Sequence, residues 1–152
     1  MSPTTPWSDP AIRRTILGGT DGSKIAGVNP WGTKLSVALE KRGELPAPDL
    51  SDNDAVHFGI VLEQVVADEY CRRTGRKVRR SNITLRDPEH AFIGGHIDRW
   101  VVGGGILECK TAGAFMTKEW GEEGTDEVPL HYIVQCRHYL MLTGADWCDL
   151  AV

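Results

Sequence analysis

Apolar residues recur at helical spacing between Asn53 and Thr74, the longest periodic stretch of the chain. Positions three or four residues apart lie on one face of an α-helix. Gly75 follows this stretch and is typical of the residue that ends a helix. The pattern therefore predicts a long helix with one apolar stripe. The stripe consists of Phe58, Val61, Leu62, Val65 and Val66.

Three shorter helices are predicted mainly from the residues at their ends. The first covers residues 20–27, where a threonine and an aspartate can cap its start. The second covers residues 34–42, with Thr33 as the N-cap and Gly43 directly after its end. The third covers residues 129–142 and begins with a proline, which suits the first turn of a helix.

Four extended stretches follow the long helix, and they are rich in Val, Ile and Thr. Residues 77–85, 91–102 and 106–111 predict three strands, and residues 146–152 predict a fourth. The triple glycine at 103–105 predicts a tight turn between the second and third strands. The order of elements predicts an α/β fold, in which helices flank a mixed β-sheet that contains a β-meander.

The composition fits one folded domain preceded by a short tail. The chain has 152 residues, of which 41% are hydrophobic and 25% are charged, and this is enough for one buried core. Residues 1–10 contain three prolines and no periodicity, which predicts a flexible N-terminal tail. We therefore expect the domain to cover residues 11–152.

Membrane insertion and secretion are both disfavoured by the sequence. No apolar run approaches the ~20 residues that span a bilayer, and the N-terminus lacks the basic and apolar regions of a secretory signal. The four cysteines lie far apart and form no CxxC pair, which disfavours a zinc or iron–sulfur site. We expect a cytoplasmic protein in a reducing compartment, with no membrane partner.

Charge is segregated along the chain, although the net charge is only −4. Residues 72–80 carry six cations, and residues 119–127 carry five anions. Net charge therefore says little about nucleic-acid binding. The basic run can contact DNA phosphates, or both runs can simply be solvated surface segments.

Two carboxylates and a lysine are predicted to meet on the β-meander. Asp98 lies in the second strand, and Glu108 and Lys110 lie in the third. Side chains alternate along a strand, so Glu108 and Lys110 share one face, and the hairpin brings Asp98 close to Glu108. Such a pair can hold a divalent cation, and the lysine can position a water. An exposed hairpin with cross-strand ion pairs is the structural alternative.

Two further groups of polar residues could belong to this site. Glu63 flanks the apolar stripe of the long helix and could face the sheet, and Glu69 is its rival. In the last helix, His131, Gln135 and His138 form a polar stripe beside the core face. The predicted core face of this helix consists of Leu130, Ile133, Val134, Leu140 and Met141.

The joint order of these residues resembles the PD-(D/E)XK nuclease superfamily, and in particular the YqaJ-like viral recombinases, relatives of the phage lambda exonuclease. The likeness covers nearly the whole chain from Arg13. It includes the Gly-Gly-Thr-Asp stretch at 18–21, the Gly-x-x-x-Glu helix ending at Glu63 and the Gly-His-Ile-Asp and Leu-Glu-Cys-Lys-Thr segments of the hairpin. The Pro-x-x-Tyr-x-x-Gln-x-x-His helix completes it, with Pro129, Tyr132, Gln135 and His138.

The resemblance implies a role for each matching residue. Asp98 and Glu108 bind the metal, and the Cys109 carbonyl and Glu63 contribute to it. Lys110 orients the attacking water, and Gln135 supports it. The residues implied to bind DNA phosphates are Arg13, Thr20, Tyr132 and His138. The implied cofactor is Mg²⁺, for which Mn²⁺ can substitute.

The implied activity is that of a phage-type 5′–3′ exonuclease that resects double-stranded DNA ends for recombination in a bacterial host. The implied partners are a single-strand annealing protein and two further copies of the chain in a trimer. An endonuclease or nickase with the same site, and a non-catalytic DNA-binding module, remain alternatives. Two departures matter: Thr20 replaces the usual serine, and the family continues beyond residue 152, so we expect a C-terminally incomplete domain.

Overall fold

The computed structural model describes residues 9–46, 48–50, 52–113 and 119–152. Three segments that alternate along the chain form each of two compact units. The first unit contains the described residues of segments 1–47, 81–96 and 130–144. The second contains those of segments 48–80, 97–129 and 145–152.

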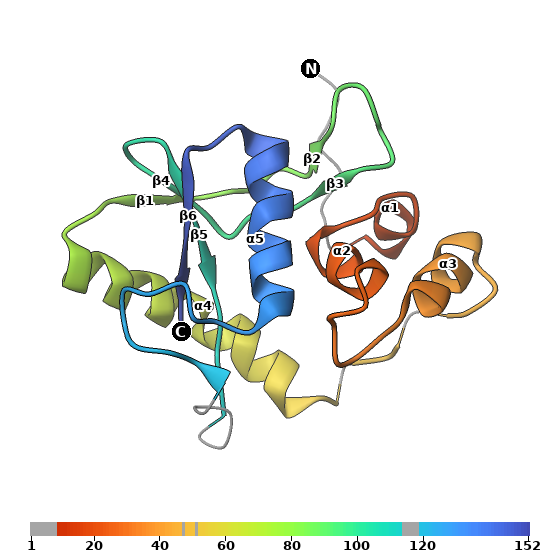
Figure 1. Cartoon of the computed structure of the whole chain (residues 1–152), viewed down its shortest axis with the longest axis horizontal. Helices are drawn as coiled ribbons and strands as arrows, with labels where there is room; N and C mark the ends of the chain where they lie inside the picture. The colour runs from red at the N-terminus through yellow and green to blue at the C-terminus, as the bar shows by residue number, and fades with distance from the viewer. Residues whose placement is uncertain (1–8, 47, 51, 114–118) are drawn as a thin grey trace. The chain divides into compact units, whose positions relative to one another are not determined.

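A four-stranded mixed sheet forms the centre of the second unit (Figure 1). Its strands lie in the order β1-β4-β5-β6. The first two pairings are antiparallel, and β5 pairs with β6 in parallel. This mixed sheet with its flanking helix confirms the predicted α/β class. The strands are β1 (Val78–Arg80), β4 (Arg99–Val101), β5 (Gly105–Cys109) and β6 (Trp147–Ala151).

The long predicted helix is present as α4 (Asp54–Thr74). The Asn53 side chain accepts a hydrogen bond from the Val56 backbone N–H at its start. Gly75 ends it with a φ of 71°, a left-handed conformation that glycine adopts without the steric cost of a Cβ. The second half of α4 packs on the sheet. The buried cluster between them consists of Ala67, Tyr70, Val101, Leu107 and Cys109.

The predicted apolar stripe of α4 is only partly buried, which corrects the expectation from its periodicity. Val66 packs against the buried cluster, but Phe58 is 52% exposed and Val65 is 58% exposed. Val61 and Leu62 are also exposed. The strands are only three to five residues long, so this small sheet covers one end of a 21-residue helix.

The first unit is mostly helical and has a small second sheet. In it α2 packs against both α3 and α5. Two-residue strands β2 and β3 pair antiparallel. The elements are α1 (Pro10–Arg14), α2 (Gly19–Ile25), α3 (Lys34–Arg42), β2 (Leu85–Arg86), β3 (Gly94–Gly95) and α5 (Leu130–Thr143).

Two of the predicted strands are each divided between the two sheets. In the stretch 77–85, β1 pairs with β4 and the last residue belongs to β2. In the stretch 91–102, β3 pairs with β2 and β4 pairs with β1. Strand propensity therefore locates strand residues in both stretches, but it predicts neither the break within each stretch nor the partner with which a residue forms its backbone hydrogen bonds.

Helix ends agree with the sequence signals at some positions and differ at others. Thr33 caps α3 and Gly43 follows it with a φ of 75°, as predicted. Helix α2 begins at Gly19 with Gly18 as its N-cap, so the predicted cap was wrong for Thr20, whereas the Asp21 side chain does accept the Gly18 backbone N–H. Helix α1 was not predicted, although Asp9 caps it and a proline begins it. Residues 1–8 of the predicted tail lie outside the described residues.

Two chemical features of the described residues concern membranes and cysteines. Helices long and apolar enough to cross a bilayer are not found among them. The four cysteines, all of which lie among the described residues, form no disulfide with one another. Burial raises the pKa of the Cys109 thiol to about 12, so this thiol is protonated at neutral pH.

Candidate functional site

The register of the β4–β5 hairpin aligns Asp98 with Glu108. Arg99 pairs with Leu107, and the next step of the same antiparallel register sets Asp98 opposite Glu108. Asp98 lies one residue before β4 rather than within it. Its Oδ2 accepts a hydrogen bond of 2.8 Å from the Cys109 backbone N–H. The predicted proximity of the two carboxylates is therefore present.

Burial disfavours the charged forms of both carboxylates. Glu108 is 4% exposed, and desolvation, together with the charge of Asp98, raises its pKa to about 7. Desolvation also raises the pKa of Asp98, and its hydrogen bond from Cys109 partly offsets this. Each carboxylate would gain from a nearby cation, which would favour its ionised form.

Lys110 supplies one such charge. Its Nζ donates a hydrogen bond of 2.6 Å to Glu108 Oε1, from two positions along the same strand face. The backbone of Lys110 also extends the pairing with the neighbouring strand, because its N–H donates to the Ala151 carbonyl at 2.8 Å. The lysine is thus fixed at the position where strand β5 ends.

Glu63 and Glu69, the two glutamates of the long helix that were candidates for the site, have different environments. Glu63 Oε1 accepts a hydrogen bond of 2.5 Å from Arg99, which is in β4. Glu69 instead lies on the surface, where Arg72 and Arg73 lower its pKa to about 2 by hydrogen bonding. The structure therefore places Glu63, and not Glu69, beside the hairpin.

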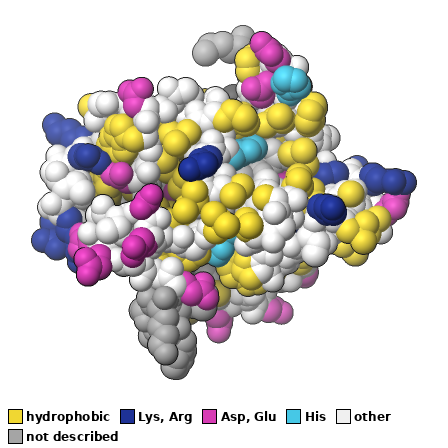
Figure 2. Space-filling view, in the orientation of Figure 1, with side chains coloured by type: hydrophobic (Ala, Val, Ile, Leu, Met, Phe, Trp, Pro, Cys, Tyr) yellow, Lys and Arg dark blue, Asp and Glu magenta, His cyan; other side chains and the backbone are white. Residues whose placement is uncertain are grey.

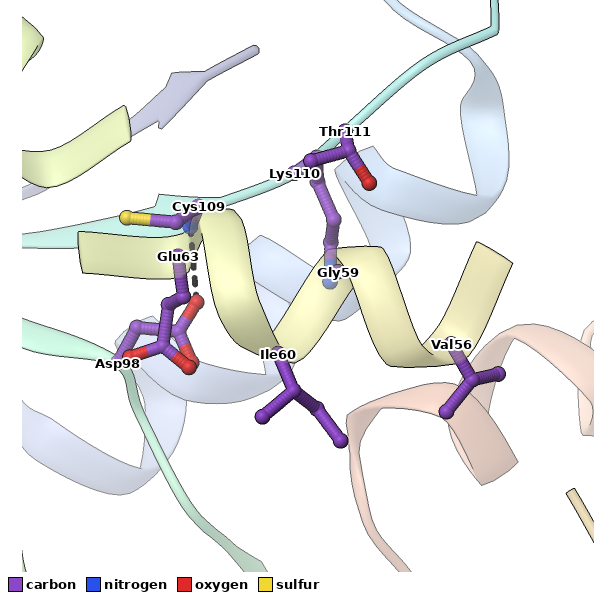
Figure 3. Close-up of a pocket in the computed structure, with 8 residues that line it drawn as sticks. All are labelled: Val56, Gly59, Ile60, Glu63, Asp98, Cys109, Lys110 and Thr111. Carbon is purple, nitrogen blue, oxygen red and sulfur yellow. Dashed lines mark hydrogen bonds between the residues drawn. The ribbon is translucent and has the colours of Figure 1, made fainter. Parts of the chain in front are cut away.

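A pocket of about 250 Å³ opens between α4 and the end of the hairpin. Figure 3 shows Glu63 and Asp98 at one end of it, while Lys110 extends over the helix near Gly59. Gly59 faces the hairpin, where a Cβ would make an ordinary van der Waals contact of 3.8 Å with the Thr111 hydroxyl. The lining residues are Val56, Gly59, Ile60, Glu63, Asp98, Cys109, Lys110 and Thr111.

The chemistry of this pocket fits Mg²⁺ better than a metal that needs a closed set of protein ligands. Among the described residues, no three His, Cys, Asp or Glu side chains converge closely enough to hold an ion. Mg²⁺ keeps several waters and is usually held by one or two carboxylates together with substrate phosphates. The pocket offers two carboxylates of that kind, Glu63 and Asp98, and Glu108 lies opposite Asp98 on the hairpin without lining the pocket.

The polar stripe of α5 is the buried side of that helix, which reverses the expected arrangement. His131 and Gln135 are buried, whereas Leu130 is 54% exposed and Met141 is 57% exposed. Gly19 of α2 makes this possible, because a Cβ there would lie only 2.8 Å from the Gln135 side chain. The predicted core face of α5 was therefore wrong at both of its ends.

The remaining predicted residues of α5 also make contacts inside the first unit. Gln135 Nε2 donates to the Tyr139 hydroxyl at 3.2 Å. His138 Nε2 lies 2.8 Å from the Gly94 carbonyl oxygen. The Tyr132 ring is half-buried, and its centroid lies 4.0 Å from that of His131. Gln135, Tyr132 and His138 thus belong to the first unit, and the carboxylates belong to the second.

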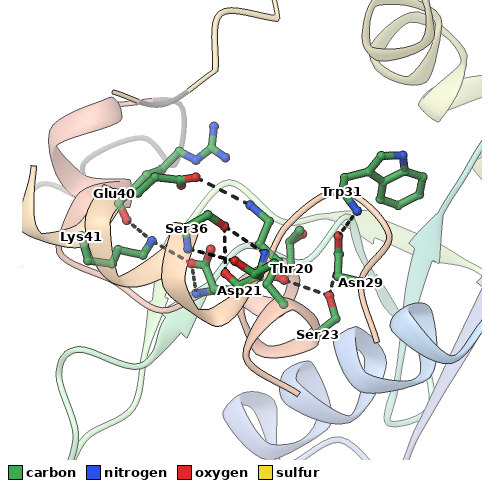
Figure 4. A network of polar contacts seen from close by, with 12 residues as sticks. Thr20, Asp21, Ser23, Asn29, Trp31, Ser36, Glu40 and Lys41 are labelled. Carbon is green, nitrogen blue, oxygen red and sulfur yellow. Dashed lines mark hydrogen bonds and ion pairs between the residues drawn. The ribbon is translucent and has the colours of Figure 1, made fainter. Parts of the chain in front are cut away.

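Arg13 and Thr20 are both exposed in the first unit. Lys41 donates a hydrogen bond to the Arg13 carbonyl at 2.8 Å and forms an ion pair with Asp21 at 2.7 Å (Figure 4). The Asp21 carboxylate also accepts the Gly18 backbone N–H, so that N–H at the start of α2 is already used. The Thr20 carbonyl accepts from a neighbouring serine, and its hydroxyl has no hydrogen bond within the described part of the chain.

The basic run does not form one uniform surface. Figure 2 shows Lys and Arg side chains gathered over the end of α4 and the turn into β1. Arg72 and Arg73 both pair with Glu69. Arg76 pairs with Asp149 and lies 4.4 Å above the Trp147 ring. These three arginines therefore already have acidic partners within the chain.

One buried residue beside the pocket, Arg99, is not predicted from the sequence as part of the site. Arg99 is 2% exposed and donates hydrogen bonds to Glu63 and to its neighbour in α4, Gln64. The sequence does contain a signal for it, because the position directly after Asp98 falls on the same face of the strand as the buried apolar positions. Sequence reasoning misses it because arginine is seldom fully buried.

Residues 10–146 match the family model described as the YqaJ-like viral recombinase domain. The match covers the hairpin, α4 and α5, and so contains every residue predicted to belong to the site. It accounts for most of the 152 residues.

Similar proteins include one curated relative and two solved structures. The uncharacterized protein YqaJ of Bacillus subtilis (strain 168) is 45% identical over 136 residues, which are 89% of this chain and 41% of that protein. The chain thus spans about two fifths of that relative's length. An alkaline exonuclease from Laribacter hongkongensis has a TM-score of 0.67 at 19% identity, covering 92% of this chain and 70% of its own. The same exonuclease in complex with dAMP has a TM-score of 0.68 at 18% identity, covering 91% and 70%.

Proposed function

Since this chain belongs to the family of YqaJ-like viral recombinase domains, we propose that it is a metal-dependent DNA nuclease of the phage exonuclease type. The fold is that of an alkaline exonuclease, which supports the proposal at the level of architecture. The remaining support comes from the chain's own residues, and it concerns the chemistry of a single pocket.

The observation that carries the proposal is the meeting of two buried carboxylates with a lysine. Asp98 and Glu108 lie opposite each other, and Lys110 donates to Glu108 at 2.6 Å. Burial raises the pKa of both acids. The carboxylate of an ordinary surface ion pair is not buried in this way. An arrangement that is unfavourable for two isolated acids suits a site that binds a divalent cation.

Each residue has a proposed role in hydrolysis of a phosphodiester bond. Asp98, Glu108, the Cys109 carbonyl and Glu63 would hold Mg²⁺, or Mn²⁺ in its place. When bound, the ion supplies Lewis-acid stabilisation of the phosphate oxygens and lowers the pKa of a bound water. Lys110 orients the water that attacks phosphorus. The attack adds the oxygen of water to phosphorus and breaks one bridging P–O bond.

Recognition of a DNA end is proposed for the first unit. The Arg13 guanidinium is suited to two phosphate oxygens, and the Thr20 hydroxyl can donate to a third. Tyr132 and His138 would contact the adjacent backbone. The similar exonuclease is crystallised in complex with dAMP, a deoxynucleoside monophosphate, and this supports DNA as the class of substrate.

The proposed substrate is the end of double-stranded DNA, digested in the 5′–3′ direction during recombination in a phage-infected bacterial cell. A single-strand annealing protein would receive the exposed strand. Three copies of the protein would encircle the duplex. These partners are taken from the family resemblance, and the pocket itself is compatible with any phosphodiester.

End-labelled linear duplexes and covalently closed circles distinguish the candidate activities. We expect degradation of linear DNA with Mg²⁺, none with a chelator and little attack on circles. A 5′-phosphorylated duplex should be degraded faster than a 5′-hydroxyl duplex, and Arg13→Ala should remove this difference. Efficient cutting of circles would indicate an endonuclease, and binding without any cleavage would indicate a DNA-binding module.

A further inference from the structure

Arg99 lies beside the candidate pocket, and the proposed chemistry gives it no role. Its side chain is 3% exposed. Among the described residues it is the only Lys or Arg that is buried to this degree. Burying a guanidinium costs free energy unless it is paired and hydrogen-bonded. The contacts of Arg99 therefore indicate its structural role.

The contacts of Arg99 join the two elements that carry the acids. Its Nη1 donates to Glu63 Oε1 at 2.5 Å and to the Asp98 carbonyl oxygen at 2.8 Å. Its Nη2 donates to Gln64 Oε1 at 3.1 Å. One guanidinium therefore connects helix α4 to the backbone of the residue that begins the hairpin.

The strand register explains why Arg99 can do this. Arg99 and Val101 lie on the face of β4 that α4 covers, because Val101 belongs to the cluster packed against Ala67. Asp98, directly before β4, lines the pocket together with Glu63 and accepts a hydrogen bond from the Cys109 N–H. Two neighbouring residues of the chain thus supply a pocket acid and the cation that fixes a second acid.

The arrangement leaves part of the Glu63 carboxylate available. One of its oxygens, Oε1, is committed to Arg99. No described residue donates a hydrogen bond to the other oxygen, and Glu63 lines the pocket together with Asp98. The guanidinium therefore restricts the carboxylate to an orientation in which one oxygen remains for a ligand.

We propose that Arg99 is a positioning residue, which holds Glu63 and the Asp98 backbone in a fixed relation so that a divalent cation meets preformed oxygen ligands. The inference rests on the proposed function, since it assumes that the pocket binds a metal. Groups that orient metal ligands in this way commonly contribute about 10- to 100-fold to metal affinity.

The sign of the effect separates positioning from simple electrostatics. Removing a positive charge close to a cation site should tighten cation binding if Coulomb repulsion were the only effect. Loss of positioning should weaken it. Arg99→Met removes the charge and the fork, whereas Arg99→Lys keeps the charge but not the planar fork of donors. Both variants are therefore informative.

The test is titration of the full chain with Mn²⁺ alone, measured by isothermal titration calorimetry. Thermal melts verify that each variant is folded. We expect both Arg99 variants to bind Mn²⁺ about 10- to 100-fold more weakly than the unchanged protein. Arg72→Met is the matched control, because Arg72 also pairs with a glutamate of α4 but on the surface. This control should bind Mn²⁺ with unchanged affinity.

A double-variant comparison shows whether Arg99 acts through Glu63. Glu63→Gln should weaken Mn²⁺ binding, and adding Arg99→Lys to it should cause little further loss, because the carboxylate to be positioned is gone. Unchanged or tighter binding in Arg99→Lys, with a folded protein, would overturn the positioning role alone. Absence of Mn²⁺ binding by the unchanged protein would overturn the proposed metal site, and this inference with it.

Discussion

At the scale of single residues, the burial of Glu108 has the clearest physical consequence. Its pKa is raised from 4.5 to about 7 in the folded chain. The folded state therefore holds the proton more tightly than the unfolded state between these two values. A divalent cation must displace that proton, so metal binding and pH are coupled through this one carboxylate.

We predict that the metal-free protein loses stability as pH rises from about 5 to about 7.5, by an amount on the order of 3 kcal/mol from Glu108. The raised folded-state pKa means that stability is greatest where the group is protonated. Urea unfolding with a chelator at both pH values measures this change. Glu108→Gln should flatten the dependence, and an equally steep dependence in that variant would contradict the assignment.

The sequence predicted the acids of the candidate site better than the residues that orient their side chains. Asp98, Glu108 and Lys110 followed from strand alternation and one glycine turn, which are local properties. Whether Glu63 or Glu69 faces the sheet depends on the rotation of α4, and in the structure it is Glu63 that bonds to Arg99. That arginine could not be assigned, because its partners lie 35 and 36 residues away in the chain.

At the scale of elements, α4 has an apolar surface larger than the sheet it packs on. Val65 is 58% exposed, whereas Ala67, two residues later, is fully buried. Periodicity identified the helix correctly, but it cannot report the size of the surface that the helix meets. The same limit explains α5, where a glycine of α2 turned the polar stripe inward.

Stability measurements can check this division of α4. Val65→Ser should change the free energy of unfolding by no more than about 0.5 kcal/mol, because the side chain is already largely exposed. Ala67→Leu should cost about 1–3 kcal/mol, because extra methyl groups must enter a filled core. Urea denaturation gives both values. A loss of more than about 2 kcal/mol in Val65→Ser would show that another surface covers this face.

The basic run between α4 and β1 also divides into two classes. Arg72 and Arg73 are engaged by Glu69. Arg79 and Arg80 are exposed on β1, and within the described part of the chain no acid pairs with either. β1 is an edge strand of the sheet, so these two side chains are the better placed for a DNA backbone.

The salt dependence of DNA binding tests this division. Arg79→Ala combined with Arg80→Ala should reduce the slope of log affinity against log salt by about 0.9 for each DNA phosphate that the variant no longer neutralises. Arg72→Ala combined with Arg73→Ala is the matched control and should leave the slope nearly unchanged. Filter binding to duplex DNA in Ca²⁺ provides the measurement. Equal slopes for both pairs of substitutions would indicate that the whole basic run is solvated surface.

At the scale of the whole molecule, the proposed roles are distributed over both units. The second contains the carboxylates and Lys110, and the first contains the exposed Arg13 and Thr20. Sequence motifs predicted both groups, because their order along the chain matches the family. The division into two interleaved units was not predictable from local patterns, since each unit is assembled from three separate segments.

The proposed nuclease site depends most on Asp98, and one measurement tests it directly: the rate at which linear duplex DNA is converted to acid-soluble nucleotides in Mg²⁺. Asp98→Asn keeps the size of the side chain but removes its charge, so we predict a loss of at least about 100-fold, as is usual when one main contributor to transition-state stabilisation is removed. Glu69→Gln, which removes a surface carboxylate of α4, should keep the full rate. A folded Asp98→Asn protein that degrades DNA at the unchanged rate would contradict the assignment of the hairpin as the nuclease site.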